Sequence, residues 1–162
     1  MALDGIYLSK LKKEIEYYAL NSRIDKVNMP EKDSIVLSLR GKNGGKKLLF
    51  STRANCMGVY FIREAPENPP VPPMLCMLLR KHLTGAVIRE ISQRELDRIL
   101  IFHLDGVNEI GDRVKLTVAF EIMGTYGNFI LIDGEGKIID AVKRIDFVSS
   151  SVRQILPGLK YA

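Results

Sequence analysis

A chain of 162 residues, 46% of them hydrophobic, is long enough for one domain with its own core, and it has no apolar run of the roughly 18–20 residues that a membrane-spanning helix needs. Its two cysteines, Cys56 and Cys76, are too few for a disulfide scaffold, and its charged N-terminus is unlike a signal peptide, so a reducing, cytoplasmic location is expected. The net charge of +5 arises within residues 1–65, where 12 basic side chains face 7 acidic ones; this permits a polyanionic partner without requiring one.

The first third of the chain predicts one helix and three strands. Apolar residues recur at spacings of three and four from Leu8 to Tyr18, which predicts a helix over residues 5–20 that packs through one face. Alternating apolar residues, separated by Pro, Asn and Gly, then predict an antiparallel meander. Its strands are expected at residues 23–29, 34–40 and 46–52.

A proline-rich segment, PENPPVPP at residues 66–73, divides the middle of the chain. Proline can neither continue a helix nor donate to a sheet, so we expect an extended surface crossing here. A short strand at residues 59–62 precedes the crossing. A helix at residues 74–83 and a strand at residues 86–92 follow it.

The stretch from residue 94 to residue 133 organises the rest of the chain, and it predicts strands at residues 98–104, 113–122 and 128–133. The first of these strands is apolar on both faces, which places it centrally with cover on both sides. The second alternates, with Leu116 and Phe120 on one face and Glu121 on the other.

The remaining residues complete an α+β fold. A tight turn at residues 133–136 predicts a returning strand at 137–145, and one helical turn is expected at 152–156. Two helices and about nine mostly antiparallel strands favour a β-sandwich or flattened barrel with the helices alongside it. We treat residues 1–162 as a single domain, and the abrupt apolar end LPGLKYA predicts that it is a fragment of a longer protein.

No residue pattern predicts catalysis, a metal or a cofactor. Cys56, Cys76, His82 and His103 lack the short spacings of metal ligands, and no nucleophile motif such as G-x-S-x-G is present. His103, in the middle of a strand, is interpreted as a hydrogen-bonded core histidine. The glycine-rich GKNGG at residues 41–45 is a hairpin turn rather than a phosphate loop, because no GK[ST] ends it.

Asp97 and Arg98 stand at the start of the central strand. Neighbouring residues on a strand point to opposite faces, so the two need not pair with each other. The Arg98 guanidinium is then placed to emerge at the sheet edge, as a fork suited to phosphate or to a base edge. The alternative is a structural ion pair in which Asp97 caps a turn, and the spacing leaves both interpretations open.

At these residues the chain resembles the N-terminal domain of the NFACT family, which comprises the RqcH and NEMF ribosome quality-control proteins and includes proteins once called fibronectin-binding protein A. The resemblance runs in order through nearly the whole chain. Its segments are MALDGIYLSKLKKEI (residues 1–15), RIDKVNMPEKDSIVLSLR (23–40), ENPPVPPMLCMLLRKHLTGAVI (67–88), ELDRILIFHLDG (95–106), EIMGTYGNFILID (121–133) and VRQILPGL (152–159).

This resemblance implies a non-catalytic RNA-binding module. Proteins of the family bind a large ribosomal subunit that still holds a peptidyl-tRNA, and they recruit tRNA so that the stalled chain is extended, in bacteria with alanine. The family's Asp-Arg pair falls on Asp97 and Arg98 and is associated with the tRNA anticodon arm; Arg98 would be the main contact, and Asp97 and Glu121 would accept from base edges. The implied RNA-binding residues are Asp97, Arg98, Glu121, Met123, Gly124, Tyr126 and Asn128.

The chain departs from the family at one of these motifs. The family pattern E-I-M-G-R-H-S-N reads here as E-I-M-G followed by Thr125, Tyr126, Gly127 and Asn128. An implied phosphate contact is thereby lost, which puts the strength or choice of tRNA in question, while Tyr126 is available to stack on a base.

The resemblance also implies a fold similar to the N-terminal domain of formamidopyrimidine-DNA glycosylases. Those enzymes use an N-terminal proline as nucleophile, whereas this chain has Ala2 and Leu3 at the corresponding positions, so no glycosylase activity is expected. Two alternatives to the tRNA-binding function remain. One is a fibronectin-binding surface adhesin, which the lack of a signal peptide disfavours, and the other is a glycosylase-like nucleic-acid binder without catalysis.

Overall fold

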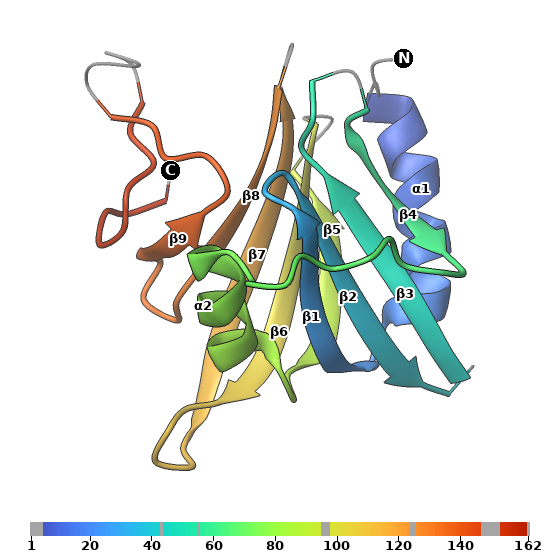
Figure 1. Cartoon of the computed structure of the whole chain (residues 1–162), viewed down its shortest axis with the longest axis horizontal. Helices are drawn as coiled ribbons and strands as arrows, with labels where there is room; N and C mark the ends of the chain where they lie inside the picture. The colour runs from blue at the N-terminus through green and yellow to red at the C-terminus, as the bar shows by residue number, and fades with distance from the viewer. Residues whose placement is uncertain are drawn as a thin grey trace.

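The computed structural model describes residues 5–42, 44–54, 56–94, 98–123, 126–146 and 153–161. Figure 1 shows helices beside one strongly curved sheet. In chain order the elements are α1 (Gly5–Ala19), β1 (Arg23–Glu31), β2 (Ser34–Gly41), β3 (Gly44–Ser51), β4 (Gly58–Ile62), α2 (Met74–Leu83), β5 (Val87–Gln93), β6 (Ile99–Val107), β7 (Arg113–Met123), β8 (Tyr126–Ile132) and β9 (Ile138–Ala141).

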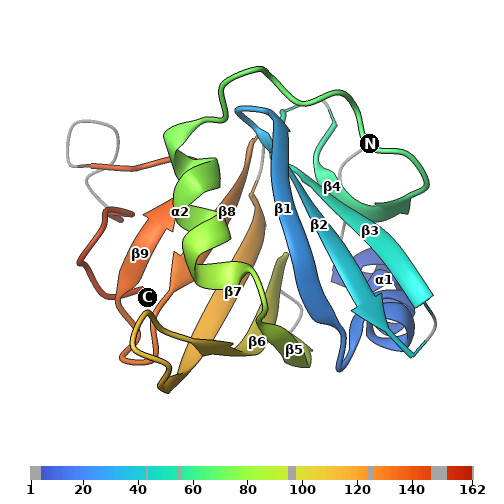
Figure 2. The same cartoon turned by 60° about the horizontal axis from the view of Figure 1, so that its bottom comes forward.

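The nine strands of the described residues form one antiparallel sheet in the order β4-β3-β2-β1-β5-β6-β7-β8-β9. The junction between β1 and β5 is short, since Arg23 and Val87 are its one pair in register. Two backbone hydrogen bonds flank this pair, from Ile24 N–H to Ala86 O at 2.8 Å and from Ile88 N–H to Ser22 O at 3.0 Å. The sheet therefore consists of two halves, β1–β4 and β5–β9, which are joined by this short junction (Figures 1 and 2).

The main core lies between the two halves. Phe50 of β3 packs edge-to-face on Phe102, Phe120 and Phe129 of the other half, with ring centroids 5.5, 5.3 and 5.1 Å away. Such pairs add about 0.5–1.5 kcal/mol to the burial of their apolar surface. Helix α2 buries Cys76, Leu79 and Leu83 and lies across the open side of the fold (Figure 2), while α1 packs on β5 and β2.

The α+β class and the two flanking helices are confirmed, but the expected sandwich or barrel is corrected to a single open sheet. The two halves face each other as in a sandwich, because the sheet folds over on itself. A barrel would need β4 and β9, the two edges, to pair with each other, and no pairing in the described part of the chain joins them.

A second, smaller core covers the opposite face of β6–β9. The segment at residues 153–161 lies over this face and buries Ile155 against Ile99, Ala119 and Ile130. The expected cover on both sides of the central strand is confirmed at Ile99, whereas His103 and Asp105 further along the same face are only half-buried. The expected helical turn is wrong for the described residues 153–156, because Ile155 instead exchanges two backbone hydrogen bonds with Ile145, of 2.7 and 2.9 Å.

Three smaller expectations differ from the structure. Strand β1 continues through Pro30 to Glu31, which is possible because the register with β2 shifts there and β5 does not reach that end. Strand β9 is shorter than expected. His103 is not a core histidine: it lies half-buried on the face opposite the main core, between its cross-strand neighbours Glu90 and Thr117.

Candidate nucleic-acid interface

One end of β6, β7 and β8 brings together Arg98, Glu121 and Asn128, three of the residues singled out from the sequence. Ile99 pairs with Glu121, and Glu121 pairs with Asn128, so the side chains of these three lie on one face of the sheet. Arg98 comes just before β6, and its carbonyl oxygen accepts a 2.8 Å hydrogen bond from the N–H of Ile122. The backbone at Arg98 is thus fixed to the strand that carries Glu121.

The Arg98 side chain is half-buried. Among the residues that the structure describes, no carboxylate forms an ion pair with its guanidinium. A guanidinium offers five N–H donors in a planar fork, which suits a base edge or a phosphate. Asp97 lies outside the described residues, and whether it pairs with Arg98 or binds RNA stays a prediction.

Gly124 also lies outside the described residues. Met123 and Tyr126 pair with each other across the β7–β8 hairpin through their backbones. Their proposed RNA contacts stay predictions, as does the stacking role of Tyr126.

Glu121 is held by a buried cluster rather than presented to solvent. Its residue is 2% exposed. The Arg153 guanidinium donates two hydrogen bonds to its carboxylate, at 2.9 Å and 2.6 Å, and the Tyr161 hydroxyl donates a third at 2.5 Å. We call Glu121, Arg153 and Tyr161 the carboxylate clasp, because they tie the segment at residues 153–161 to the central strands.

Hydrogen bonds and burial shift the pKa values of Arg153 and Tyr161 in the carboxylate clasp. The hydrogen bonds to Glu121 raise the pKa of Arg153 above its ordinary value. Burial raises the pKa of the Tyr161 phenol, and the negative charge of Glu121 raises it further. The Arg153 guanidinium also lies 5.3 Å from the centroid of the Tyr161 ring, which adds a cation–π contact. The arrangement therefore gives the buried carboxylate one positive and one neutral hydrogen-bond donor.

The side chain of Asn128 is also buried, and it binds the backbone of a later segment of the chain. It is 1% exposed, and its side-chain amide donates to the Lys143 carbonyl at 2.9 Å while its Oδ1 accepts from the N–H of Lys143 at 3.0 Å. The Oδ1 also accepts from Phe129 N–H at 2.9 Å. Asn128 thus fixes the chain after β9 to β8, and a direct RNA contact by its side chain would require that chain to move.

The two halves of the sheet touch at this same end. Gly127 donates to the carbonyl of Thr52, after β3, at 3.3 Å, and the Lys143 ammonium donates to the same oxygen at 3.2 Å. A Cβ at Gly127 would lie 3.2 Å from both the Thr52 Cα and the Glu121 carbonyl oxygen. Glycine at this departure from the family pattern therefore permits a close backbone approach. Burial lowers the pKa of Lys143.

Sequence reasoning missed Arg153, Tyr161 and Lys143. The sequence did contain an indication of Arg153. Glu121 lies within a largely apolar strand, and a buried glutamate needs a positively charged or hydrogen-bond-donating partner. The last segment of the chain contains Arg153 close to the apolar Ile155, which is the pattern of a segment packed across a sheet. Nothing in the sequence points to Tyr161 or Lys143.

Other kinds of site have no support within the described ranges. They contain no group of three or more His, Cys, Asp or Glu side chains able to hold a metal ion. Cys56 is exposed and Cys76 is buried. Neither α1 nor α2 combines the length and apolar character of a membrane-crossing helix, as judged over the described residues.

Residues 4–162 match the family described as NFACT N-terminal and middle domains. The chain belongs to this family. The resemblance found in the sequence is thereby confirmed. Among curated relatives, this NFACT chain is 40% identical to the Rqc2 homolog RqcH of Bacillus subtilis over 162 residues, 99% of the chain and 28% of that protein. It is 32% identical to the archaeal Rqc2 homolog aRqcH of Methanocaldococcus jannaschii over 145 residues, 88% of the chain and 20% of that protein.

Solved structures of the same fold exist for related proteins. The N-terminal domain of the fibronectin-binding protein PavA from Streptococcus pneumoniae has a TM-score of 0.93 and 35% identity, with 99% of this NFACT chain and 64% of that chain covered. The N-terminal part of the fibronectin/fibrinogen-binding protein FBPS from Streptococcus suis has a TM-score of 0.94 and 40% identity, with 99% and 61% covered. The chain spans less than a third of the length of the RqcH relatives.

Proposed function

We propose that this chain is the tRNA- and large-subunit-binding module of a cytoplasmic ribosome quality-control factor. In this function it recruits tRNA(Ala) to large subunits that still hold a peptidyl-tRNA, for alanine tailing of the nascent chain, and itself catalyses no reaction. The observation that carries the proposal is the match to RqcH across 99% of the chain. The net charge of +5 is compatible with an RNA partner.

Arg98 is the residue that we propose makes the principal tRNA contact. The residue is half-buried, its guanidinium has no carboxylate partner in the described part of the chain, and its backbone is fixed by Ile122. Such an arrangement reduces the conformational entropy lost when a planar fork docks on a base edge or phosphate. Glu121, by contrast, is proposed to position the strands and not to accept from RNA, because its carboxylate already accepts three hydrogen bonds.

The test is tRNA binding measured by fluorescence anisotropy for wild type, Arg98→Ala and Arg113→Ala. Arg113 is an exposed arginine at the opposite end of β7, so its replacement changes the net charge equally. Loss of a good bidentate contact should weaken binding by about 1–3 kcal/mol for Arg98→Ala, which is roughly 5- to 150-fold. The control should remain within about twofold of wild type. Equal affinities for the two variants would contradict the assignment of Arg98.

A second candidate function is fibronectin binding, which the names of the structurally similar PavA and FBPS proteins favour. It predicts a saturable interaction of this chain with immobilised fibronectin at physiological salt. Binding that disappears between about 50 and 200 mM salt would instead indicate the unspecific attraction of a basic surface. A glycosylase-like DNA-binding function predicts a preference for duplex DNA over tRNA of similar length.

A further inference from the structure

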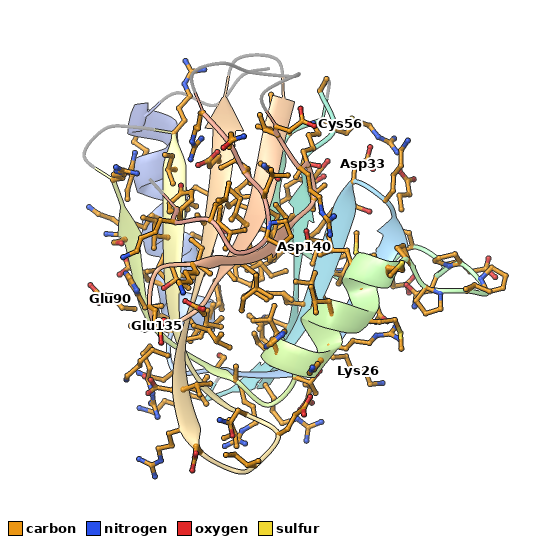
Figure 3. All side chains as sticks on the ribbon, turned by 90° about the vertical axis from the view of Figure 1, so that its left-hand side faces the viewer. Lys26, Asp33, Cys56, Glu90, Glu135 and Asp140 are labelled. Carbon is orange, nitrogen blue, oxygen red and sulfur yellow. The ribbon has the colours of Figure 1, made fainter. Side chains whose placement is uncertain are left out.

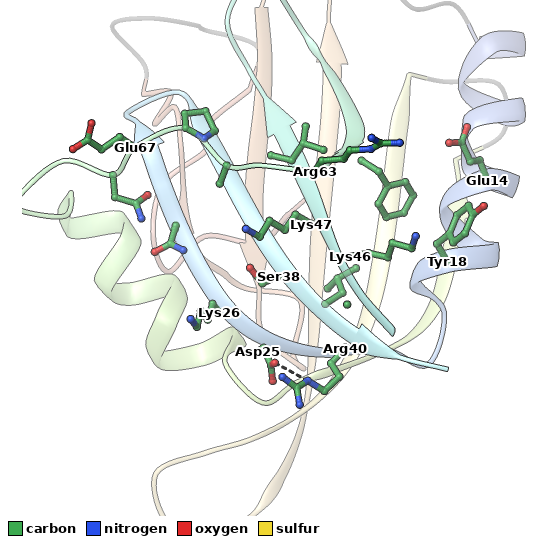
Figure 4. A pocket seen from close by; sticks show the side chains of 18 residues that line it. Glu14, Tyr18, Asp25, Lys26, Ser38, Arg40, Lys46, Lys47, Arg63 and Glu67 are labelled. Carbon is green, nitrogen blue, oxygen red and sulfur yellow. Dashed lines mark ion pairs between the residues drawn. The ribbon is translucent and has the colours of Figure 1, made fainter. Parts of the chain in front are cut away.

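An open groove with a volume of about 920 Å³ lies on the β1–β4 half of the sheet (Figure 4). It extends over parts of β1, β2 and β3, and it is bordered by α1 on one side and by the segment at residues 61–68 on the other. It shares no residue with the end of the sheet at Arg98, which belongs to the β5–β9 half. The groove is therefore separate from the site around Arg98 and Glu121.

Basic side chains form a row across the floor of the groove. Lys26 of β1 is paired with Ser38 of β2, and Ser38 is paired with Lys47 of β3. Directly paired residues project from the same face of a sheet, and neighbouring strands lie about 4.8 Å apart, so the two lysines start about 10 Å from each other with a hydroxyl between them. Figure 4 shows the three side chains on the same side of the strands. The row is therefore fixed by the register and not by flexible loops.

The carboxylates that line the groove balance only part of its positive charge. In the described part of the chain no carboxylate forms an ion pair with Lys26, Lys47 or Arg63. Asp25 is paired with Arg40 at 3.0 Å.

Two further carboxylates, Glu14 and Glu67, border the groove on α1 and on the 61–68 segment. The acidic Glu90 and Glu135 of the other half lie on a different side of the molecule from Lys26 (Figure 3). Five basic and three acidic residues line the groove, which leaves it an excess of two positive charges.

The aromatic residues of the groove are already engaged. The ammonium of Lys46 lies 4.9 Å from the centroid of the Tyr18 ring, and Tyr18 makes an edge contact with Phe61 at 5.4 Å. A ring with a cation over its face is not free to stack on a nucleobase. The groove therefore offers ammonium groups and a hydroxyl to a ligand, and these donors suit phosphate oxygens rather than base faces.

We propose that this groove binds the phosphate backbone of RNA, without reading its bases, as a second contact surface of the same module. The inference rests on the proposed function in taking RNA as the partner, and it adds the place and the chemistry of the contact. Lys26 and Lys47 contact phosphates on neighbouring nucleotides, and the Ser38 hydroxyl donates between them. Arg98 then provides selectivity at one end of the fold, and the groove provides salt-sensitive affinity on the other half.

The experiment measures binding of fluorescein-labelled oligo(U), which has no base pairs, between about 50 and about 200 mM salt. The groove variant is Lys26→Gln/Lys47→Gln. The control variant is Arg113→Gln/Lys160→Gln, which removes two charges from exposed positions outside the groove. Circular dichroism establishes that each variant is folded. Each lost phosphate contact on a single strand should reduce the slope of log K against log salt by about 0.7, so two contacts reduce it by about 1.4.

Over this fourfold rise in salt, wild type and control should lose about sevenfold more affinity than the groove variant. An equal reduction of the slope in both variants would overturn the proposal, because only net charge would then matter. If polyglutamate displaces oligo(U) as effectively as tRNA does, the RNA assignment is overturned in favour of an acidic protein.

The two proposals fail separately. An unchanged tRNA affinity in Arg98→Ala removes the function proposed for Arg98, whereas matching slopes for the groove and control variants remove the groove alone.

Discussion

Replacing Arg153 with alanine should be among the most destabilising single changes available on the surface of this fold. The change leaves the Glu121 carboxylate, whose side chain is 3% exposed, without its positive partner. Removing one member of a buried ion pair costs about 3–5 kcal/mol. Because 28% of the Arg153 side chain reaches solvent, water can partly replace it, and we take the lower limit of about 3 kcal/mol. For a chain of this size that corresponds to a fall in Tm of roughly 6–12 °C.

The matched control for this measurement is Arg144→Ala. Arg144 also binds a carboxylate through two hydrogen bonds, to Asp140 at 3.0 and 2.9 Å, but 59% of its side chain is exposed. The Asp140 side chain is only 12% exposed, but the mostly exposed Arg144 lets water screen the pair, so we expect its loss to cost about 1 kcal/mol. Urea unfolding followed by circular dichroism should therefore separate the two variants by about 2 kcal/mol. A loss of under about 1 kcal/mol for Arg153→Ala, or equal losses for both, would refute the reasoning that burial makes the carboxylate clasp strong.

The stability lost in Tyr161→Phe should depend on pH. Burial raises the pKa of Tyr161, so the folded chain holds the phenol proton more tightly than the unfolded chain does. The contribution of the protonated Tyr161 phenol to the free energy of unfolding is fully present below the pKa of about 10 that the phenol has in the unfolded chain. It is lost as the pH rises through that value towards the pKa of the folded chain. At neutral pH, removal of one hydroxyl donor from a charged acceptor should cost about 1.5 kcal/mol. The stability gap between wild type and Tyr161→Phe should narrow above about pH 10, and a gap that widens there would have the wrong sign.

Three further predictions concern the surroundings of these residues. Asn128→Ala should lower the free energy of unfolding by about 2–3 kcal/mol in urea titrations, because it leaves buried backbone groups without partners. Gly127→Ala should cost about 1–3 kcal/mol in the same assay, since its Cβ would press on backbone 3.2 Å away, whereas Gly45→Ala, whose Cβ has 3.9 Å to its nearest neighbour, should be close to neutral. Burial lowers the pKa of His82 and the charge of Glu109 opposes this, so Glu109→Gln should lower that pKa further in an NMR titration; a rise would contradict the charge assignment.

The secondary structure was largely predictable because local rules govern it here. Helix α2 occupies the range predicted from the proline crossing before it and from Gly85 after it, which has a φ of +87°. Strand β7 alternates as the sequence does, with Leu116 and Phe120 in the main core and Glu121 on the other face. The folding of the sheet over on itself was not predictable, because it depends on the short junction of Arg23 with Val87, and nothing in the sequence marks these two residues as a junction.

The candidate site was predictable in place but not in its contacts. Alternation put Glu121 on the face opposite the main core, and the structure agrees. Its burial, however, comes from Arg153 and Tyr161, which lie 32 and 40 residues further along the chain. Periodicity describes what lies beside a residue on its own element, and it contains no information on a segment that returns over the sheet from such a distance.

This burial restricts what Glu121 can contribute to the proposed RNA binding. An ionised carboxylate has about four acceptor positions, and Arg153 and Tyr161 already occupy three of them. At 2% exposure no base edge reaches the carboxylate unless the segment at residues 153–161 leaves the sheet. Arg98, which comes just before the strand paired with Glu121 and has its carbonyl bound to Ile122, is the donor that we propose contacts RNA at that end. Loss of Glu121 should then weaken RNA binding only to the extent that it displaces Arg98, so stability and affinity should fall together in Glu121→Gln, whereas in Arg98→Ala affinity should fall alone.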